Sequence, residues 1–474
     1  MKIKAVKIVL FISMFLLLLY LVTSILKFKY DGGIYSLKIF YEQEENTIDV
    51  LFLGSSHSYS HIVCSDLYKD YGISSYNLGG GVQPFWNTYY YLKEALKTQK
   101  PKLIVIDIFT SYIYSDFIDN SFILDNNLGI KSYINRINSI MISADKSQWN
   151  YFFNPLYQYH NRYSSLTSED FLHYKGYNKY IYWKGEILLY KPYTNINTNF
   201  MENTNKIKMY EKTEKYYRAI IELIKKYNIP LLLIKTPTFL NNDYQVFFNS
   251  AHEIALEYNV DFINFNDNYS DYNLDFSKDF ADQWGHLNYI GAKKFTEYLG
   301  KYLKDHYDLP DRRGDPKYYY WEMDSKYNCK EIYNFELKQY TNFNEYIEKV
   351  KNADDYVIGI TMLGNYKNND TVVQSIVTNF NIDNVYSNNA SYVIDNNKLI
   401  YSSLGSNQYL FYDEIGRYTD LVVDSGKKLS INRKNYIKET NGINILIYDK
   451  FTEKIVDNIY LEYKENSVNY IIER

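Results

Sequence analysis

Cysteine is nearly absent from this sequence, and its scarcity limits the chemistry that the chain can carry. Only Cys64 and Cys329 occur in 474 residues, far apart and outside any Cys-x-x-Cys pattern. Two such thiols do not form a disulfide framework or a zinc-binding motif, so we interpret them as free thiols. The seven histidines and the acidic residues also lack a compact metal-ligand spacing. We therefore expect no metal and no cofactor.

The sequence also lacks a strong excess of charge of either sign. Its formal net charge is −4, which gives no electrostatic argument for nucleic acid as a partner. Internal repeats are absent as well. Tyrosine, in contrast, occurs 56 times. We attribute this mainly to an AT-rich genome and only secondarily to aromatic side chains that stack on sugar rings.

Charged residues are missing from one long apolar segment near the N-terminus, residues 8–26. As a helix this segment spans roughly 30 Å, the thickness of the hydrocarbon core of a membrane. Residues 22–24 (Val-Thr-Ser) make a poor cleavage site, so we predict an uncleaved anchor over residues 1–29. The basic N-terminus favours a single-pass cell-membrane protein whose chain is extracytoplasmic from about residue 30 onward.

Apolar runs alternate with amphipathic segments from residue 48 to residue 305. Residues 102–109 form an almost continuous β-branched run, which is typical of a parallel strand covered on both faces. The order of the segments predicts an α/β fold with a doubly wound parallel sheet. We expect strands at 48–54, 75–81 (a short strand that breaks into a glycine turn), 102–109, 230–235 and 261–265, and helices at 59–71, 86–98, 209–227, 243–258 and 289–305.

Three features divide the chain into domains. Residues 113–205 interrupt the alternation with a segment rich in Tyr, Asn and Ser, which we predict to be an insertion that caps the carboxyl edge of the sheet. The segment 308–325 opens with a polar stretch that contains two prolines and a glycine, and we predict a linker there. Short alternating segments follow. We therefore expect an α/β domain at 30–307 and a mostly-β domain at 326–474.

Two short motifs, far apart in the sequence, combine a serine, a histidine and an aspartate. Gly54-Ser55-Ser56 follows the first strand, and Asp282 and His286 precede the last helix of the α/β domain. A serine on a sharp strand-to-helix turn presents its hydroxyl at the carboxyl edge of a sheet, where a histidine oriented by an aspartate can take its proton. No other pair of segments offers a nucleophile, a base and an orienting carboxylate. The sequence therefore predicts catalysis here.

These motifs resemble the SGNH/GDSL hydrolase superfamily, over about residues 46–305. The resemblance implies that Ser56 is the nucleophile, His286 the base and Asp282 the orienting carboxylate. It also implies an oxyanion hole built from the backbone amide of Ser56 and one amide of a following glycine block. The glycines of that block are Gly79, Gly80 and Gly81. The superfamily fold is a three-layer, flavodoxin-like arrangement of the kind that the alternation predicts.

A narrower resemblance rests on Gly-Ser-Ser-His-Ser at residues 54–58 and Gly-His-Leu-Asn at 285–288, with a Gly-Ala pair after it. It is to membrane-anchored SGNH proteins of bacterial surfaces, related to those that O-acetylate exopolysaccharides or D-alanylate teichoic acids. Residues 159–163 (Tyr-His-Asn-Arg-Tyr) resemble an element of the same set. The resemblance implies a cell-surface polysaccharide as substrate and a membrane-bound acyltransferase as partner. His160 and Arg162 are candidate substrate-binding residues, with a structural contact as the equal alternative.

The chain departs from the superfamily pattern at two places. Asp282 and His286 are one residue further apart than in the pattern, a spacing that still brings both side chains to one face of a helical turn. The third block, Gly-x-Asn-Asp, is replaced by residues 108–111 (Ile-Phe-Thr-Ser). Either a hydroxyl there donates to the oxyanion or that donor is missing. We expect His57 and His61, on the outgoing helix, to point away from the position of the base.

The second domain carries a resemblance of its own, over about residues 330–465. It is strongest in residues 420–462 and is to the interleukin-like EMT inducer domain, which implies a compact β sandwich with carbohydrate-binding capacity in some relatives. Together the motifs predict an extracytoplasmic serine esterase or O-acyltransferase that acts on a cell-surface polysaccharide. The alternative is a catalytically inactive protein that binds glycan or serves as a scaffold, with a decayed site.

Overall fold

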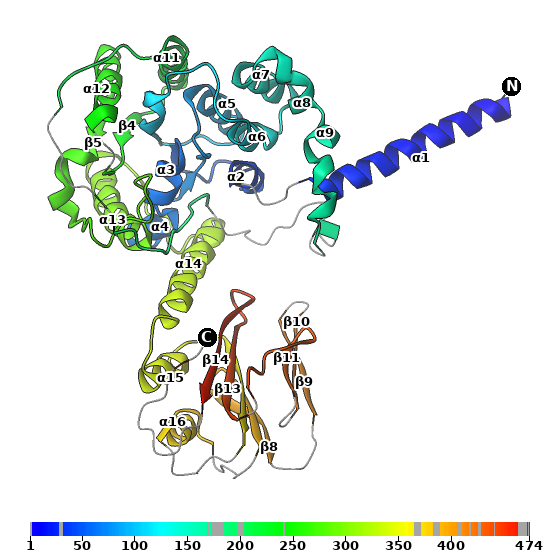
Figure 1. Ribbon diagram of the computed structural model, residues 1–474. Coiled ribbons are helices and arrows are strands. Elements are labelled where there is room, and N and C mark those ends of the chain that lie inside the picture. The colour runs from blue at the N-terminus through cyan, green and yellow to red at the C-terminus, as the bar shows by residue number, and fades with distance from the viewer. Residues whose placement is uncertain are drawn as a thin grey trace. The chain divides into compact units, whose positions relative to one another are not determined.

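The computed structural model divides the chain into two compact units, Met1–Ser325 and Lys326–Arg474 (Figure 1). The described residues are 2–27, 32–167, 170–171, 184–194, 196, 203–239, 242–364, 371–382, 389–404, 410–416, 419–424, 428–439, 441–462, 472 and 474. Each unit has its own buried apolar clusters. The two units therefore have separate cores.

A five-stranded parallel sheet forms the centre of the first unit. The strands are β1 (Val50–Leu53), β2 (Ser75–Asn77), β3 (Leu103–Asp107), β4 (Leu231–Lys235) and β5 (Asp261–Asn264). They are ordered β2-β1-β3-β4-β5, and every neighbouring pair is parallel. All five strands were predicted from the apolar runs, and the structure confirms them with shorter ends.

Helices cover both faces of this sheet, as the continuous apolar strands predict. Successive side chains of a strand point to opposite faces: Leu51 and Leu53 join one apolar cluster, and Val50 and Phe52 join another. The first face carries α5 (Phe85–Ala95), α11 (Glu211–Lys226) and α12 (Asn242–Glu257), and the second carries α4 (Cys64–Tyr71) and α13 (Tyr289–His306). This arrangement confirms the α/β class.

The first helical segment differs from the expectation of one helix over 59–71. The structure has two helices, α3 (Ser56–His61) and α4, separated at Ile62 and Val63. The amide of Val63 binds the side-chain oxygen of Thr296 on α13 at 2.9 Å. This tertiary contact gives the Val63 amide a partner at the break between the two helices.

The predicted insertion, residues 113–205, is mostly helical where the structure describes it. Its elements are η1 (Phe109–Tyr112) at its border, α6 (Asn120–Leu128), α7 (Tyr133–Ser143), η2 (Lys146–Gln148), α8 (Trp149–Phe153), α9 (Pro155–Tyr159) and η3 (His160–Ser164). Helix α6 packs against α2 (Gly32–Phe40), and α7 packs against α5. The helices therefore flank the domain, and residues between 113 and 122 reach the carboxyl edge of the sheet.

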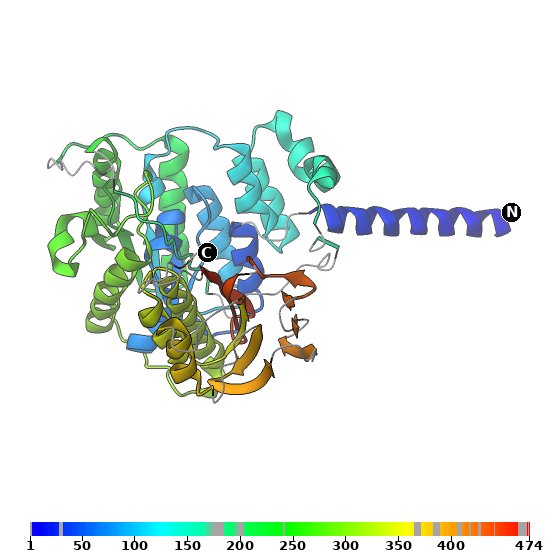
Figure 2. The ribbon, with the colours of Figure 1, turned by 60° about the horizontal axis from the view of Figure 1, so that its bottom comes forward.

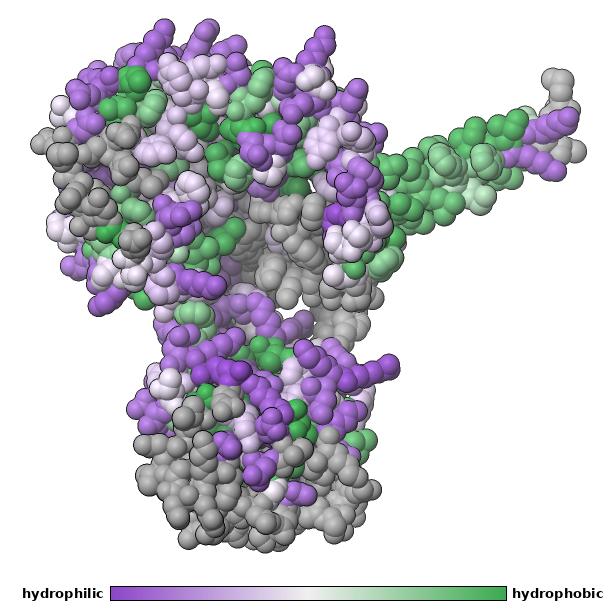
Figure 3. All heavy atoms as spheres, viewed as in Figure 1, coloured by the Kyte–Doolittle hydropathy of each residue, from purple (hydrophilic) through white to green (hydrophobic). Residues whose placement is uncertain are grey.

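The apolar N-terminal segment forms helix α1 (Lys2–Leu26). Residues Lys4–Leu26 are long and apolar enough to cross a membrane, and most of the helix is exposed, although Leu26 at its end is buried. Its surface is apolar along most of its length, as Figure 3 shows. The prediction of an apolar helix is confirmed, while its orientation in a membrane stays a prediction.

The segment 308–325 packs onto the first unit. The guanidinium of Arg312 binds both carboxylate oxygens of Asp49, at 2.7 and 2.9 Å. The indole nitrogen of Trp321 donates to the carbonyl oxygen of Ser75 at 2.9 Å. Trp321 belongs to α14 (Tyr319–Leu337), which crosses the boundary between the units.

The second unit is built on two antiparallel sheets, as its short alternating segments predict. One has the order β14-β13-β6-β7-β8 and the other β12-β11-β10-β9. Their strands are β6 (Tyr356–Leu363), β7 (Ala390–Asp395), β8 (Lys398–Leu404), β9 (Leu410–Gly416), β10 (Thr419–Asp424), β11 (Lys428–Ile431), β12 (Lys434–Asn435), β13 (Gly442–Asp449) and β14 (Lys454–Glu462). Side chains of both sheets share one apolar cluster, and α15 (Phe343–Lys351) and α16 (Thr371–Phe380) contribute to a second.

Candidate active site

The turn between β1 and α3 presents Ser56 at the carboxyl edge of the parallel sheet. Gly54 has a φ of +143°, and a Cβ there would lie 3.0 Å from the Cβ of Asp107. A side chain at this position would be strained and crowded. Ser55 caps the helix, because its hydroxyl oxygen accepts a hydrogen bond from the amide of His57 at 3.4 Å. The edge between β1 and β3, where the strand order reverses, is where ligands bind in such sheets.

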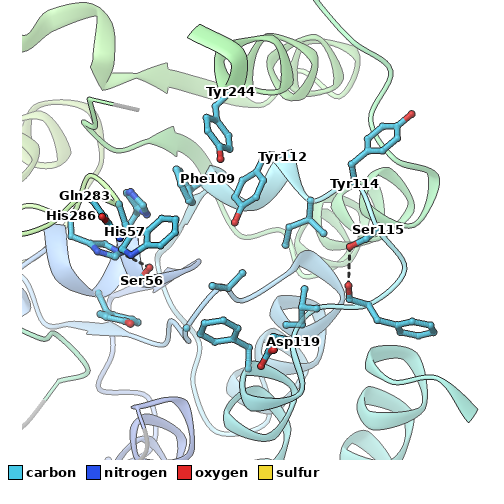
Figure 4. A pocket seen from close by; sticks show the side chains of 18 of the residues that line it. Ser56, His57, Phe109, Tyr112, Tyr114, Ser115, Asp119, Tyr244, Gln283 and His286 are labelled. Atoms are coloured by element: carbon cyan, nitrogen blue, oxygen red, sulfur yellow. Dashed lines mark hydrogen bonds between the residues drawn. The ribbon is translucent and has the colours of Figure 1, made fainter. Parts of the chain in front are cut away.

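The structure brings Ser56, His286 and Asp282 together, and Figure 4 shows Ser56 beside His286. The distance between Nε2 of His286 and Oγ of Ser56 is 2.7 Å, and Nδ1 of His286 lies 2.7 Å from Oδ2 of Asp282. These residues are separated by up to 230 positions in the sequence. The geometry is that of a nucleophile, a base and an orienting carboxylate in hydrogen-bond reach of each other.

Asp282 and His286 lie in a non-helical turn, whereas their spacing suggested a turn of helix. Its Oδ1 accepts the amide of Trp284 at 2.9 Å, and the amide of Gly285 points to the carbonyl oxygen of Asp282 at 3.4 Å. Gly285 adopts a φ of +77°, which glycine reaches without steric cost. The extra residue between Asp282 and His286 is thus accommodated in a glycine turn, and the contact between the two side chains is preserved.

Opposing effects set the charge of Asp282. Its partial burial alone would raise the pKa of the carboxyl group. The hydrogen bond and charge of His286, together with the amides of Trp284 and His286, outweigh burial and lower this pKa below its ordinary value. Asp282 is therefore ionised at neutral pH and can stabilise a protonated His286.

The three candidate oxyanion glycines occupy different positions. The amide of Gly80 donates to the carbonyl oxygen of Gly54 at 3.2 Å, so it is already engaged. Gly81 lines the pocket beside Ser56, and its amide makes a long hydrogen bond of 3.4 Å to the carboxylate of Asp125. A Cβ on Gly79 would lie 3.1 Å from the carbonyl oxygens of Gly54 and Ser55. Of the three glycines only Gly81 lines the pocket, so its amide is the stronger candidate beside the amide of Ser56, with that of Gly79 as the alternative.

Residues 108–111, which stand where the SGNH/GDSL pattern has its third block, present no hydroxyl donor to Ser56. The hydroxyl of Thr110 donates to the carbonyl oxygen of Gln83 at 3.0 Å, and Thr110 and Ser111 are both buried. Neither residue is among those that line the pocket. Phe109 lines it instead. A hydroxyl of this segment is therefore not available to an oxyanion at Ser56 in this structure.

A stack of rings lies against His286. The ring of His57 lies 4.7 Å from that of His286, and the ring of Phe109 lies 3.7 Å from that of His57. The Nζ of Lys235 lies 5.1 Å from the centre of the Phe109 ring. We call His57, Phe109 and Lys235 the buried stack. The expectation that His57 and His61 point away from the base is wrong, because both rings contact His286.

Burial determines the charge of these groups. Burial, together with the nearby charges of His286 and Lys235, lowers the pKa of His57 and of His61 well below the ordinary value of histidine. Both imidazoles are therefore neutral at neutral pH. The Nε2 of His61 accepts the amide of Leu287 at 3.0 Å, so His61 fixes the backbone beside His286. His286 alone among the three is bonded to Ser56.

Lys235 and Asp107 are both buried, at the ends of β4 and β3, and each affects the charge of the other. Burial lowers the pKa of Lys235 to about 8, although the charge of Asp107 opposes the shift. Burial also raises the pKa of Asp107 against the effect of Lys235. The carboxylate accepts the amides of Phe109 (3.1 Å) and Thr236 (3.0 Å). The motif analysis missed this pair, whose only sequence signal is a polar residue at the end of each apolar strand.

Ser56 and His286 open into a pocket of about 960 Å³ (Figure 4). Its walls are largely aromatic: Tyr59, Phe109, Tyr112, Tyr114, Phe117, Phe122, Phe239, Tyr244 and Trp284. Trp284, two residues before His286, is 61% exposed. Across the described residues, no three His, Cys, Asp or Glu side chains gather into a metal-binding group, and a reaction without a metal stays a prediction.

His160 and Arg162 lie outside this pocket. The Nδ1 of His160 is 2.7 Å from the carbonyl oxygen of Tyr157. The guanidinium of Arg162 donates to the carbonyl oxygens of Leu26 (2.7 Å) and Lys27 (2.9 Å) and pairs with Asp170. The structural alternative for these residues therefore has direct contacts, while substrate binding by either stays untested.

Comparisons with known proteins add little to this geometry. No family model and no curated protein matches the chain. Among solved structures, a putative acylhydrolase from Bacteroides fragilis NCTC 9343 is 12% identical, with a TM-score of 0.29, over 56% of this chain and 93% of that one. A GDSL-like lipase from Bacteroides thetaiotaomicron VPI-5482 is 11% identical, with a TM-score of 0.27, over 54% of this chain and 87% of that one. The catalytic interpretation rests on the site itself.

Proposed function

We propose that this protein is a serine esterase or O-acyltransferase of the SGNH type that acts on a cell-surface polysaccharide from the outer face of the membrane. The observation that carries the proposal is the pair of 2.7 Å contacts that join Ser56, His286 and Asp282 at the pocket. This geometry, which joins three residues from two distant segments, is the one that an activated serine needs, and it favours the enzyme over the inactive alternative.

The first half of the reaction forms an acyl-enzyme. The Oγ of Ser56 attacks the carbonyl carbon of the acyl group while Nε2 of His286 takes the hydroxyl proton. Asp282, hydrogen-bonded at Nδ1, keeps His286 in the required tautomer and stabilises its positive charge. The tetrahedral intermediate collapses when His286 returns the proton to the leaving alkoxide, which departs as an alcohol.

The oxyanion is stabilised by backbone amides. We assign this role to the amide of Ser56 and that of Gly79 or Gly81. The buried hydroxyl of Thr110 does not contribute. Losing one oxyanion donor typically costs roughly 2.7–4 kcal/mol of transition-state stabilisation, so a site with two amides reacts more slowly than one with three donors but still reacts.

The second half of the reaction depends on the acceptor. His286 removes a proton from water or from a sugar hydroxyl, and the resulting nucleophile attacks the acyl-enzyme and releases Ser56. Water gives deacylation and a sugar hydroxyl gives transfer. Aromatic side chains such as Tyr112, Tyr244 and Trp284 around the opening offer flat apolar faces for sugar rings, and a membrane-bound acyltransferase could deliver the acyl group.

Ester hydrolysis tests the proposal directly. The full chain in detergent is assayed with p-nitrophenyl acetate beside Ser56→Ala and His286→Ala, with Ser115→Ala as the matched control. Ser115 lines the same pocket but donates to the carbonyl oxygen of Phe117. We expect the first two variants to lose the activity and the control to keep it. Equal activity in all four proteins would contradict the proposal.

The inactive glycan-binding alternative makes the opposite prediction. A well-folded protein that neither hydrolyses the ester nor reacts with a fluorophosphonate at Ser56, yet retains glycan, would favour that alternative. Labelling at Ser56 without ester hydrolysis would favour strict transfer to a sugar acceptor.

A further inference from the structure

A second cavity, of about 530 Å³, lies at the C-terminal end of α1. Its walls come from α7, α8 and α9 and from Lys27, the residue that follows the apolar helix. Aromatic and aliphatic side chains make up most of the lining, among them Tyr133, Trp149 and Tyr159. Figures 1 and 2 both show the helical segment that contains α9 beside this end of α1.

Two cations face this cavity without a matching anion. Lys27 and Arg136 both line it, and its described lining contains no Asp or Glu. Arg136 lies over the ring of Tyr133 at 5.8 Å, and neither cation has an ion pair recorded with another described residue. Burial and the charge of Arg136 lower the pKa of Lys27. Two like charges in one cavity are stabilised when an anion binds between them.

Arg162 fixes the cavity at the end of the apolar span. Its guanidinium donates to the carbonyl oxygens of Leu26 and Lys27, which belong to the end of α1, where helical carbonyls lack intrahelical partners. Asp170 binds the other side of the same guanidinium at 3.0 Å. The insertion is thereby attached at the depth where the apolar segment stops.

Exposed apolar and aromatic side chains lie on α7, on α9 and on the adjoining η3. Ile134 is 71% exposed, Tyr157 58% and Tyr163 74%. Tyrosine and tryptophan are enriched where a membrane meets water, and amphipathic segments bury apolar side chains in the headgroup region. The cavity therefore combines two cations, Lys27 and Arg136, with the residue types of a membrane interface.

We propose that this cavity binds the phosphate group of an anionic membrane lipid in the leaflet next to the α/β domain. Lys27 and Arg136 hold the phosphate oxygens, and the aromatic walls contact the adjacent glycerol and the first methylene groups. The inference rests on the membrane anchoring included in the proposed function. It gives the insertion a role in setting the height and rotation of the domain on the membrane.

Lipid-selective quenching tests this site without any measure of activity. The full chain is incorporated into phosphatidylcholine nanodiscs, and doxyl-labelled phosphatidylglycerol or phosphatidylcholine is added at low mole fraction. Quenching of Trp149 is obtained by subtracting the signal of a Trp149→Phe variant. We expect about a thirty-fold preference for the anionic lipid, corresponding to two interfacial cations.

Charge variants assign the preference to the cavity. The double variant Lys27→Gln with Arg136→Gln should lose the preference, while Lys146→Gln, which removes an exposed positive charge on η2 outside the cavity, should keep it. Equal quenching by both lipids in the wild type, or an unchanged preference in the double variant, would overturn the proposal. Binding of inorganic phosphate without any preference between the two lipids would also overturn the proposal, because the cavity would then be a site for a free anion. A chain that fails to enter the nanodiscs would contradict the anchoring itself.

Discussion

The group of Ser56, His286 and Asp282 and the buried stack beside it are held by different forces. Ser56, His286 and Asp282 are partly exposed and are fixed by short directional hydrogen bonds. The buried stack of His57, Phe109 and Lys235 is held by ring contacts, and burial lowers the pKa values of its two ionisable members. Hydrogen bonds therefore join Ser56 to His286 and His286 to Asp282, while the lowered pKa of His57 makes it a weaker base than an ordinary histidine.

The largest effect is expected from Asp282→Asn. The amide keeps the size of the side chain but removes its charge and favours the wrong tautomer of His286, so kcat should fall by up to about 10⁴-fold. Asp119→Asn is the matched control, because Asp119 also lines the pocket but caps α6, and asparagine caps equally well. Steady-state ester hydrolysis measures both. A loss of less than tenfold in Asp282→Asn would show that the carboxylate does not orient the base.

A smaller effect is expected in the buried stack. His57→Ala removes the ring between Phe109 and His286 and lets His286 shift, so we expect kcat to fall by about 100-fold with KM unchanged. His57→Phe restores a ring of similar shape and should recover most of this loss. Comparing kcat and KM of the two variants shows whether His57 acts by packing against His286 or by a chemical role of its own nitrogens. Equal losses in both would mean that a nitrogen of His57, and not its packing, is required.

Stability at alkaline pH should report the buried lysine. The pKa of Lys235 is about 8 in the folded protein against an ordinary value of 10.5. The unfolded chain therefore binds the extra proton between these values, and stability rises with pH across this window. We expect the free energy of unfolding to rise by about 2 kcal/mol from pH 8 to pH 10 relative to Lys235→Met. Urea unfolding of both proteins at the two pH values measures the difference. The same pH dependence in the wild type and in Lys235→Met would contradict a lowered pKa for Lys235.

The smallest effect is expected at the pocket opening. Trp284→Ala removes an exposed aromatic face but leaves the backbone amide that binds Asp282. The KM for an acylated oligosaccharide should rise by about three- to tenfold, the range expected for one lost stacking contact. Hydrolysis of p-nitrophenyl acetate should be unchanged, since that substrate is too small to use the contact. An equal change in KM for both substrates would mean that the Trp284 side chain helps to position Asp282 and does not bind the sugar.

Sequence patterns predicted the strands and the triad because both depend on local signals. The apolar runs at 48–54 and 230–235 are typical of buried parallel strands. The small-residue turn after the first strand places Ser56 at the end of that strand. The final helix likewise places His286 at the same edge of the sheet. These constraints are strong enough to bring together residues 230 positions apart.

The buried stack and the anchor contact could not be predicted in the same way. Nothing in the residue pattern indicates that the ring of Phe109 would lie against His57, since this depends on how η1 leaves β3. The bond from Arg162 to the end of α1 joins segments 136 positions apart that share no periodicity. Both contacts arise from tertiary packing, for which a single sequence carries no signal.

Covalent labelling of Ser56 tests the central claim most directly. A fluorophosphonate probe reacts with a serine only when a neighbouring base activates it, so the wild type should label rapidly and peptide mapping should place the adduct on Ser56. Ser56→Ala and His286→Ala should not label, although Ser55 remains in both. Labelling that persists in Ser56→Ala, or a folded wild type that never reacts, would contradict the account of an activated serine at the end of β1.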